Sequence, residues 1–550
     1  MKNKVLKVHP SDDAIVALTD LKKGERIEFE GQVYLLKNDV PVKHKFAGKT
    51  YQVGDPVIMY GILVGKATQV IEKGDCLTIN NVKHAAAEFT GKTEQVSWQT
   101  PDISRFQGRT FQGYHRPDGK VGTANYWLMV PMVFCENRNL NFIKEALLKE
   151  LGYAKGAKYQ QHSRKLVEMY QSGKSTDEIL AEELLVEEES DMAQRIFPNV
   201  DGIKFLNHEG GCGGTREDSD TLCSLLAGYI THPNVAGVTV LSLGCQHAQV
   251  DILKKEIEKR DPDFSKPIYI FEQQEIGSEE KLVTEAIKKT FVGLIQANEI
   301  IRQPAPLNKL TIGLECGGSD GFSGISANPA LGYVSDLLST LGGTVILSEF
   351  PELCGVEQEL INRCTSEALA NKFRSIQGAY AAKAEAVGSG FDMNPSPGNI
   401  KDGLITDAIK SAGAAKKGGT SPVTDVLDYT EPATQPGLSL LCTPGNDVES
   451  TTGLAGSWAN LILFTTGLGT PTGNPVTPVI KVASNTRLAE RMPDIIDVST
   501  GSIITGEETI QEMGERLLEY CIKVASGEIS TKAMQLGQDD FIPWKRGVSL

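Results

Sequence analysis

Four segments of this sequence share one pattern, a short apolar run that leads directly into a cysteine or histidine within a turn. The runs lead to Cys135, to His208 and Cys212, to Cys245 and His247, and to Cys316. Each is followed by a segment with the periodicity of a helix. Because ligands of an open α/β sheet bind outside the carboxyl ends of its strands, this order presents thiols and imidazoles where ligands bind. The pattern therefore predicts a metal-dependent enzyme on an α/β scaffold.

The composition is that of a globular protein large enough for about three domains. The chain has 550 residues, of which 40% are hydrophobic and 23% are charged. No apolar run approaches the roughly 20 residues that a membrane helix needs, and MKNKVLKVHPSDD lacks the apolar core of a secretory signal. Ten cysteines without a CxxC pair are typical of reduced thiols, so we expect a cytoplasmic protein.

The net charge argues against nucleic acid as the main partner. The formal charge is −15 and the isoelectric point is about 5.2, whereas phosphate binding needs a basic face. An anionic small-molecule substrate is compatible with this charge, because a metal ion and a few local cations dominate the field at short range. We expect a homo-oligomer, a dimer, with no nucleic-acid or membrane partner.

The chain divides into four parts by pattern. Residues 1–95 show short alternating runs broken by glycines, which predicts a small all-β domain. Residues 96–108 read as a linker. Residues 109–301 and 302–550 alternate strand and helix patterns. The predicted fold is a small β domain followed by two α/β domains with open, largely parallel sheets.

Three smaller features complete this division. The acidic stretch at 175–193 is predicted to be a solvated helical insertion. A helix is predicted at about 507–525. A stretch rich in Gly, Ser and Pro, about 386–436, suggests no particular element.

The segment NHEGGCGGTRED, residues 207–218, is the strongest local signal for a site. Its glycines let the backbone approach a ligand closely, and His208 and Cys212 have a workable spacing for metal ligands. The alternative is a tight turn with a core cysteine, since cysteine is often buried. Cys245 and His247, at the end of another predicted strand, shift the balance toward a site.

Two further regions are rich in hydroxyl groups. ECGGSDGFSGISANP, residues 315–329, contains Ser319 and Asp320 and suits a polyol, although an irregular loop is the simpler interpretation. The C-terminal strand ends add Thr452, Thr465 and Thr466, which suit sugar hydroxyls. Lys481 is a candidate general base or carboxylate clamp, with a surface lysine as the alternative.

Several common site types have no support in the sequence. GLGTPTG misses GxGxxG by one residue and GxxxxGK[ST] is absent, which excludes the Rossmann and P-loop fingerprints. Neither a zinc finger nor a GxSxG hydrolase is indicated.

The small β domain contains three histidines, His9, His44 and His84. They suggest that the β domain faces an active site, with scattered surface histidines as the alternative.

A set of motifs spread over about residues 5–505 resembles one known family. The motifs are LKVHPSDDAIVAL, YGILVGKAT, FQGYHRPDGKVGTANYW, NHEGGCGGTRED, LSLGCQ, ECGGSDGFSGISANPALG, TPGND and FTTGLGTPTGNPVTPVIKV. Together they resemble the altronate and galactarate dehydratases, and the first two resemble the SAF (β-clip) domain of that family. The HEGGCGG form is closer to the altronate branch.

The resemblance implies a hydro-lyase of carbohydrate metabolism that converts D-altronate to 2-keto-3-deoxy-D-gluconate and water, with galactarate or a related acid as the alternative substrate. It also implies a divalent metal, usually Fe²⁺ and otherwise Mn²⁺, which can stabilise an enediolate and assist a leaving hydroxyl. We expect the metal ligands among Cys212, Cys245, His208, His9 and His44. We expect the catalytic residues to be His208, Cys212 and Lys481. Ser319, Asp320, Thr452, Thr465 and Thr466 are expected to bind substrate.

One departure and two alternatives accompany this expectation. The altronate branch often ends its SAF domain with an HxHN-type motif, where this chain has Thr78, Ile79, Asn80 and Asn81, and His84 is a candidate replacement. An iron–sulfur cluster is an alternative cofactor, held by three of the strand-end thiols Cys135, Cys212, Cys245 and Cys316. A non-catalytic sugar-acid binding protein is the alternative from another functional class.

Overall fold

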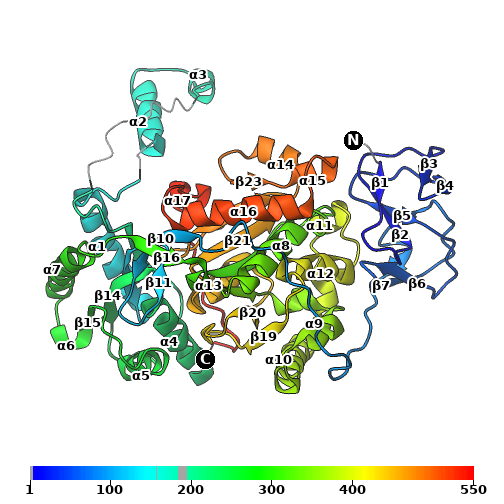
Figure 1. The fold of residues 1–550 in the computed structure, drawn as a ribbon. Coiled ribbons are helices and arrows are strands. Elements are labelled where there is room, and N and C mark those ends of the chain that lie inside the picture. Colours follow the sequence, from blue (N-terminus) through cyan, green and yellow to red (C-terminus); the bar gives the residue numbers. More distant parts are fainter. Residues whose placement is uncertain (1–3, 156–157, 184–194, 550) are drawn as a thin grey trace.

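The computed structural model describes residues 4–155, 158–183 and 195–549 (Figure 1). The N-terminal part is a domain of short antiparallel strands, as the sequence predicts. The first sheet has the order β1 (Val5–Leu6), β2 (Ala14–Ala17), β5 (Lys45–Ala47) and β8 (Cys76–Leu77). The second has the order β6 (Pro56–Met59), β7 (Ile62–Ala67) and β9 (Val82–Lys83). The third is the hairpin of β3 (Arg26–Phe29) and β4 (Gln32–Leu35). Figure 1 shows this domain in blue beside the yellow-green helices of the C-terminal part.

The segment between β9 and β10 (Thr110–His115) contains no helix or strand and runs along the C-terminal part of the molecule. The Thr90 amide donates to Gln358 Oε1 at 2.8 Å, and Trp98 Nε1 donates to Thr420 Oγ1 at 3.2 Å. β10 then pairs antiparallel with β16 (Gln303–Pro306) and with β11 (Val121–Gly122). The two chain ends of the second domain therefore lie next to each other.

The second domain is a four-stranded parallel sheet covered by helices. Its order is β13 (Gly202–Phe205), β12 (Tyr126–Pro131), β14 (Val235–Ser242) and β15 (Ile268–Glu272). The helices include α1 (Asn137–Glu150), α4 (Arg216–Ile230), α5 (Val250–Arg260) and α7 (Glu279–Ala297). All eight residues of β14 are buried, as expected for a parallel strand covered on both faces.

The predicted acidic insertion begins as a helical segment. α2 (Lys158–Gln171) and α3 (Thr176–Leu180) project away from the second domain in Figure 1. Ser175 caps α3, and Glu178 completes a capping box. The rest of the predicted helix falls largely on residues 184–194, which lie outside the described residues.

The C-terminal domain is built on a seven-stranded parallel sheet. Its order is β19 (Val423–Leu427), β20 (Gly437–Leu441), β18 (Thr344–Leu347), β17 (Thr311–Cys316), β21 (Leu461–Thr466), β22 (Val479–Ala483) and β23 (Val498–Ser499). α8 (Ala327–Thr340) packs against α16 (Ile510–Ala525), which confirms the helix predicted near 507–525. α13 (Asp447–Gly456) packs against α4 of the second domain. These sheets confirm the predicted fold class.

The strand order places a ligand crevice in this sheet. From β17 the chain moves first to β18 on one side, and it later returns to β21 on the other side. Ligands of open α/β sheets bind at such a reversal, outside the carboxyl ends of the two strands. The crevice therefore lies where β17 ends at Cys316 and β21 ends at Thr466.

The stretch 386–436 contains helices that the sequence pattern did not reveal. They include α11 (Pro397–Lys401), α12 (Asp407–Ala415) and the short η5 (Lys416–Gly418). All nine residues of α12 are buried, including its polar residues Asp407, Lys410 and Ser411, so its polar face points into the protein and not to solvent.

Within the described residues, no helix combines the length and the apolar character needed to cross a membrane.

Candidate active site

A cluster of buried ionisable side chains lies at the carboxyl edge of the seven-stranded sheet. β17 and the turn after β18 supply the acidic members, and α12 and η5 supply the basic ones. The members are Glu315, Cys316, Glu349, Glu352, Lys410 and Lys417. Charges are costly to bury unless they are paired, so their number at one edge needs a physical explanation.

The cluster consists of two ion pairs with a thiol between them. Lys417 Nζ lies 2.7 Å from Glu349 Oε2, and Lys410 Nζ lies 2.6 Å from Glu352 Oε1. Cys316 Sγ lies 3.0 Å from Glu352 Oε2 and 3.5 Å from Glu349 Oε2. The thiol at the end of β17 thus contacts both carboxylates.

Burial divides the cluster into protonated and ionised groups. It raises the pKa of Glu315 well above its usual range, and the charge of Glu349 adds to this. Burial also raises the pKa of the Cys316 thiol. For Glu352 burial acts in the same direction, but Lys410 and Lys417 outweigh it and lower the pKa. The edge therefore holds both proton donors and a carboxylate in a site that is shielded from water.

The backbone at Glu349 is strained. Its φ angle is 68°, in the left-handed region that residues other than glycine rarely adopt, and this conformation costs about 1–3 kcal/mol. The Glu349 amide donates to Thr443 Oγ1 at 2.8 Å, which helps to hold the turn. Such strain concentrates at functional sites, where it places a side chain that a relaxed turn would not.

Asp447 is partly exposed beside the buried cluster. It is the first residue of α13, and burial, followed by the charges of Glu349 and Glu352, raises its pKa to about 7. A Cβ atom at Gly317 would lie 2.2 Å from Asp447 Oδ2, so the carboxyl group reaches over a turn that only glycine allows. A partly accessible carboxyl with a near-neutral pKa is suited to acid–base catalysis.

The β domain packs against this edge. Lys43 Nζ lies 2.8 Å from Asp320 Oδ2, and His44 Nε2 lies 2.9 Å from the carbonyl oxygen of Lys401. His84 Nδ1 lies 3.3 Å from the backbone nitrogen of Ala408 in α12. Two of the three predicted histidines of this domain therefore lie against the C-terminal domain.

His9 lies elsewhere on the β domain. Its Nδ1 atom is 2.7 Å from the hydroxyl of Ser11, and the side chain is exposed. Its predicted role as a metal ligand stays a prediction.

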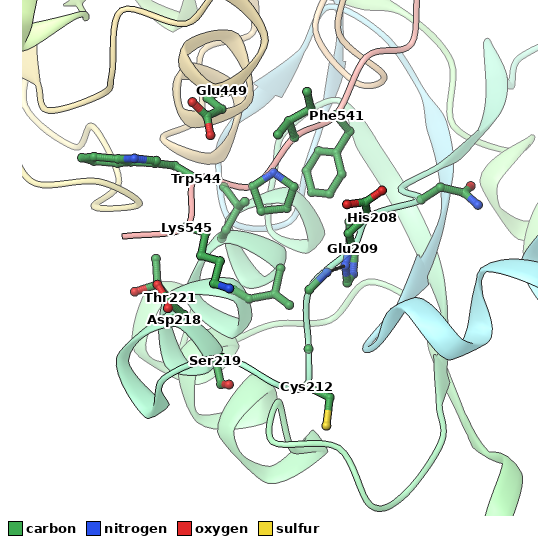
Figure 2. A pocket seen from close by; sticks show the side chains of 18 of the residues that line it. His208, Glu209, Cys212, Asp218, Ser219, Thr221, Glu449, Phe541, Trp544 and Lys545 are labelled. Atoms are coloured by element: carbon green, nitrogen blue, oxygen red, sulfur yellow. Dashed lines mark hydrogen bonds between the residues drawn. The ribbon is translucent and has the colours of Figure 1, made fainter. Parts of the chain in front are cut away.

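His208 and Cys212 line a separate cavity of about 700 Å³ between the second domain and the C-terminal segment around Trp544 (Figure 2). His208 Nε2 lies 2.7 Å from the Pro131 carbonyl oxygen, and its Nδ1 accepts a hydrogen bond from the Gly210 amide at 3.0 Å. Burial lowers the pKa of His208 to about 4. Its ring is thus neutral, with both nitrogens engaged by the backbone.

The thiols predicted to hold an iron–sulfur cluster are divided between two sheets. Cys135, Cys212 and Cys245 are exposed and follow strands of the second domain. Cys316 is buried at the edge of the C-terminal sheet. Three of the four candidate thiols thus lie on the second domain, and the iron–sulfur cluster stays a prediction.

Two groups of three metal-ligating side chains have their ligand atoms within 4.8 Å of one another in the described part of the chain. One is His84, Cys354 and Asp407, and the other is Cys316, Glu349 and Glu352. Neither group includes the predicted ligands Cys212, Cys245, His208, His9 and His44. Roles of those five residues in metal binding stay predictions.

Asp320, Thr465 and Thr466, three of the residues predicted to bind substrate, lie at or just after the carboxyl ends of β17 and β21 and have structural partners. Asp320 Oδ1 accepts hydrogen bonds from the Ser323 and Ser484 hydroxyls at 2.9 and 2.8 Å. Thr465 Oγ1 donates to Asn328 Oδ1 at 2.7 Å, and Thr466 Oγ1 accepts from the Gly469 amide at 3.0 Å. These contacts shape the crevice, while direct contact with substrate stays a prediction.

Ser319 and Thr452 also take part in backbone contacts. The carbonyl oxygen of Ser319 accepts from Asn399 Nδ2 at 2.8 Å. Thr452 Oγ1 accepts from the Ile542 amide at 3.1 Å, near the cavity that contains His208. The sugar-binding roles of both residues stay predictions.

Lys481 is a buried lysine and not a surface one. It lies in β22 with its side chain 0% exposed, and its Nζ contacts the Thr472 carbonyl oxygen and the face of Phe464. Burial lowers its pKa to about 8. The surface alternative is excluded, and the choice between base and carboxylate clamp stays open.

The basic members of the cluster and both glutamates after β18 were missing from the predicted site. The signal for the glutamates was present, because the apolar run GTVIL leads directly into Ser348 and Glu349. TPGND likewise carried Asp447 within a recognised motif. No comparable signal marks Lys410 or Lys417, because lysines are usually exposed and these two are buried.

Three family descriptions match almost the whole chain. The "Altronate/galactarate dehydratase SAF domain" matches residues 3–85, and the "D-galactarate dehydratase/Altronate hydrolase, second domain" matches residues 113–298. The "D-galactarate/Altronate dehydratase, C-terminal" domain matches residues 307–549. These spans cover the three domains of the structure in order.

Full-length relatives agree with these matches. The chain is 32% identical over 524 residues to the altronate dehydratase of Bacillus subtilis (strain 168), covering 95% of each chain. Identity and coverage are the same for the altronate dehydratase of Escherichia coli (strain K12). The galactarate dehydratase (L-threo-forming) of the same Escherichia coli strain is 30% identical over 97% of this chain and 94% of its own. With its three domains in the same order and such relatives over nearly its whole length, this chain belongs to the altronate/galactarate dehydratase family.

Proposed function

We propose that this protein is a hydro-lyase that converts D-altronate to 2-keto-3-deoxy-D-gluconate and water, and that the cluster around Cys316 is its active site. The observation that carries this proposal is the buried thiol, carboxylate and lysine cluster in the sheet crevice, with Asp447 beside it. Two relatives named altronate dehydratase, each 32% identical over 95% of the chain, support the substrate.

The reaction needs one proton acceptor and one cationic partner. The C2–H bond breaks as a base takes the proton, the C3–O bond breaks, and the departing hydroxyl takes up a proton to become water. The enol that remains then ketonises to the 2-keto acid. Since the C2 proton lies next to a carboxylate, positive charge must stabilise the enediolate that forms.

Asp447 is suited to move the proton in both steps. With a pKa of about 7 it is largely ionised at mildly alkaline pH and can accept the C2 proton. The neutral carboxyl group then holds a proton that the departing hydroxyl can take. Asp447 thus passes the proton that it takes from C2 to the departing hydroxyl, and no second acid is needed.

Lys410 is suited to hold the substrate carboxylate. Burial opposes its charge, but the carboxylate of Glu352 outweighs burial and raises its pKa, so it remains an ammonium group. Two of its three N–H bonds point to Glu352 and to Asn394, at 2.6 and 2.9 Å. The third can donate to a substrate oxygen in the same crevice.

The divalent metal implied by the family has a fitting donor set in this chain. His84, Cys354 and Asp407 offer nitrogen, sulfur and oxygen ligands together, and the buried carboxylate of Asp407 has no donor among the described residues other than the Cys354 thiol. These three residues would hold iron(II). When bound, the ion supplies a Lewis acid that polarises substrate oxygens.

We also propose a cytoplasmic location. All ten cysteines are free thiols, and three of them are exposed. A reducing compartment keeps exposed thiols in this state.

The substrate assignment predicts a clear order of activities. Anaerobic protein supplied with iron(II) should dehydrate altronate with a kcat/KM at least about tenfold above that for galactarate, a difference of about 1.4 kcal/mol in transition-state binding. The 2-keto-3-deoxy acid is the product to measure. Galactarate as the better substrate would overturn the substrate but not the reaction class.

The same measurement tests the non-catalytic alternative. Tight binding of altronate without product, with iron(II) present, would favour a sugar-acid binding protein and contradict the proposed activity.

A further inference from the structure

We propose that His84, Cys354 and Asp407 form a site for one divalent first-row transition-metal ion, with the β domain supplying the histidine. His84 follows β9, Cys354 follows the short helix η3 (Phe350–Leu353), and Asp407 begins α12. Their ligand atoms lie within 4.8 Å of one another. The site is independent of the sugar acid's identity, and only its part in catalysis rests on the proposed function.

Asp407 provides the first argument. Its side chain is 0% exposed, and among the described residues the only side chain that can donate to its carboxylate is the Cys354 thiol, itself a member of the site. Lys410, one turn further along α12, pairs with Glu352 and Asn394 instead. A buried carboxylate needs a cation or several donors, and a bound metal ion would meet that need.

The other two side chains converge on the same point. His84 Nδ1 lies 3.3 Å from the backbone nitrogen of Ala408, a long contact that a metal ion can replace. His84 and Cys354 are both half-buried, so an ion can reach them from solvent. A thiolate and a carboxylate together neutralise a divalent ion, so the loaded site carries no net charge.

The donor set selects the class of metal. Imidazole and thiolate favour iron(II), cobalt(II) and zinc(II), whereas magnesium and calcium prefer oxygen ligands. The site therefore fits a first-row transition metal.

The second ligand group is a poorer metal site. Glu349 and Glu352 are each paired with a buried lysine, at 2.7 and 2.6 Å. A divalent ion between Cys316 and these carboxylates would lie close to two ammonium groups. Repulsion between like charges in a buried site disfavours that arrangement.

The position of His84 also bears on the absence of the HxHN-type motif, where this chain has Thr78 and Asn80 in place of histidines. The turn that carries Thr78 and Asn80 closes on itself, with the Thr78 amide donating to Asn81 Oδ1 at 2.7 Å and the Asn80 amide donating to Thr78 Oγ1 at 3.3 Å. It offers no imidazole. The β domain instead brings His84 to the C-terminal domain from a later position on the chain.

Cobalt(II) is the probe that tests the site without reference to turnover. Metal-free full-length protein is titrated anaerobically with cobalt(II), and the near-ultraviolet thiolate-to-cobalt charge-transfer band is followed. We expect saturation at about one equivalent. Cys354→Ser should abolish the band, and Asp407→Asn and His84→Gln should weaken cobalt binding at least about tenfold.

Two matched thiol variants serve as controls. Cys316→Ser tests the second ligand group and Cys212→Ser the predicted turn, and both should keep the band. Asp407→Asn retains the side-chain shape, so the melting temperature of the metal-free variant should match that of the metal-free wild type. This comparison shows whether a variant has lost metal binding or has lost its fold. A band absent from the wild type, or lost in Cys316→Ser or Cys212→Ser but kept in Cys354→Ser, would overturn the site. A protein that binds cobalt as expected but does not dehydrate altronate counts against the proposed function alone.

Discussion

Replacing Asp447 with asparagine is expected to lower kcat for altronate by about two to four orders of magnitude, the usual contribution of a positioned acid–base group. The side chain keeps its size, so KM and the melting temperature should change little. The matched control is Glu449→Gln, two residues further along α13 and also partly buried, which lines the separate cavity near His208. Steady-state kinetics of both variants with altronate make the comparison. Wild-type turnover in Asp447→Asn would remove this residue from the mechanism.

The pH dependence of the wild type should run in opposite directions for activity and stability. As a base, Asp447 must be ionised, so kcat/KM should rise with a midpoint near pH 7. Its pKa is raised on folding from about 4 to about 7, so between these values the folded state binds a proton that the unfolded state has released. The contribution of this group to stability therefore falls as the pH rises across that window. Asp447→Asn should lose both dependences.

Removal of the Lys417 ammonium group is expected to produce the largest change in stability. Lys417 and Glu349 form a buried pair at 2.7 Å, with side chains 1% and 0% exposed. Lys417→Met would leave an uncompensated buried carboxylate, a change that typically costs about 3–5 kcal/mol. Addition of Glu349→Gln should recover much of the loss, because the double variant leaves no charge unpaired.

The control for this prediction is an exposed ion pair of similar length. Lys372 lies 2.8 Å from Glu431 with both side chains well exposed, and Lys372→Met should cost about 0–1 kcal/mol. Urea unfolding of all variants gives the comparison. If Lys417→Met were as stable as Lys372→Met, the pair would not hold the crevice together.

Local patterns in the sequence predicted the fold well. Residues 302–550, predicted to alternate strands and helices, contain the apolar runs LTIGLE, GTVILSE, LSLLC, LILFTTG and PVIKVAS. Each run supplies a strand of the seven-stranded sheet, because buried parallel strands are continuous apolar runs. Such patterns do not determine which strands belong to the same sheet, and therefore which turns lie close together. The turn around Cys212 and the turn after Cys316 look alike in sequence, but they lie on different sheets.

Other parts of the site leave no local trace. Lys410 lies on a short helix that is buried on every face, whereas a lysine in a sequence is usually expected at the surface, so nothing local points to its place in the site. The left-handed backbone of Glu349 depends on tertiary contacts around Thr443. The sequence offers His84 as a candidate replacement for the missing histidines, but its partners Cys354 and Asp407 come together with it only in the folded chain.

The most direct test of the central claim is a crystal structure of the full-length protein with 2-keto-3-deoxygluconate bound. The account predicts that the carboxylate of this product contacts Lys410 and that its C2 and C3 atoms face Asp447, at the carboxyl end of β17. Product bound instead in the cavity lined by His208, Cys212 and Trp544, with none beside Asp447, would contradict it.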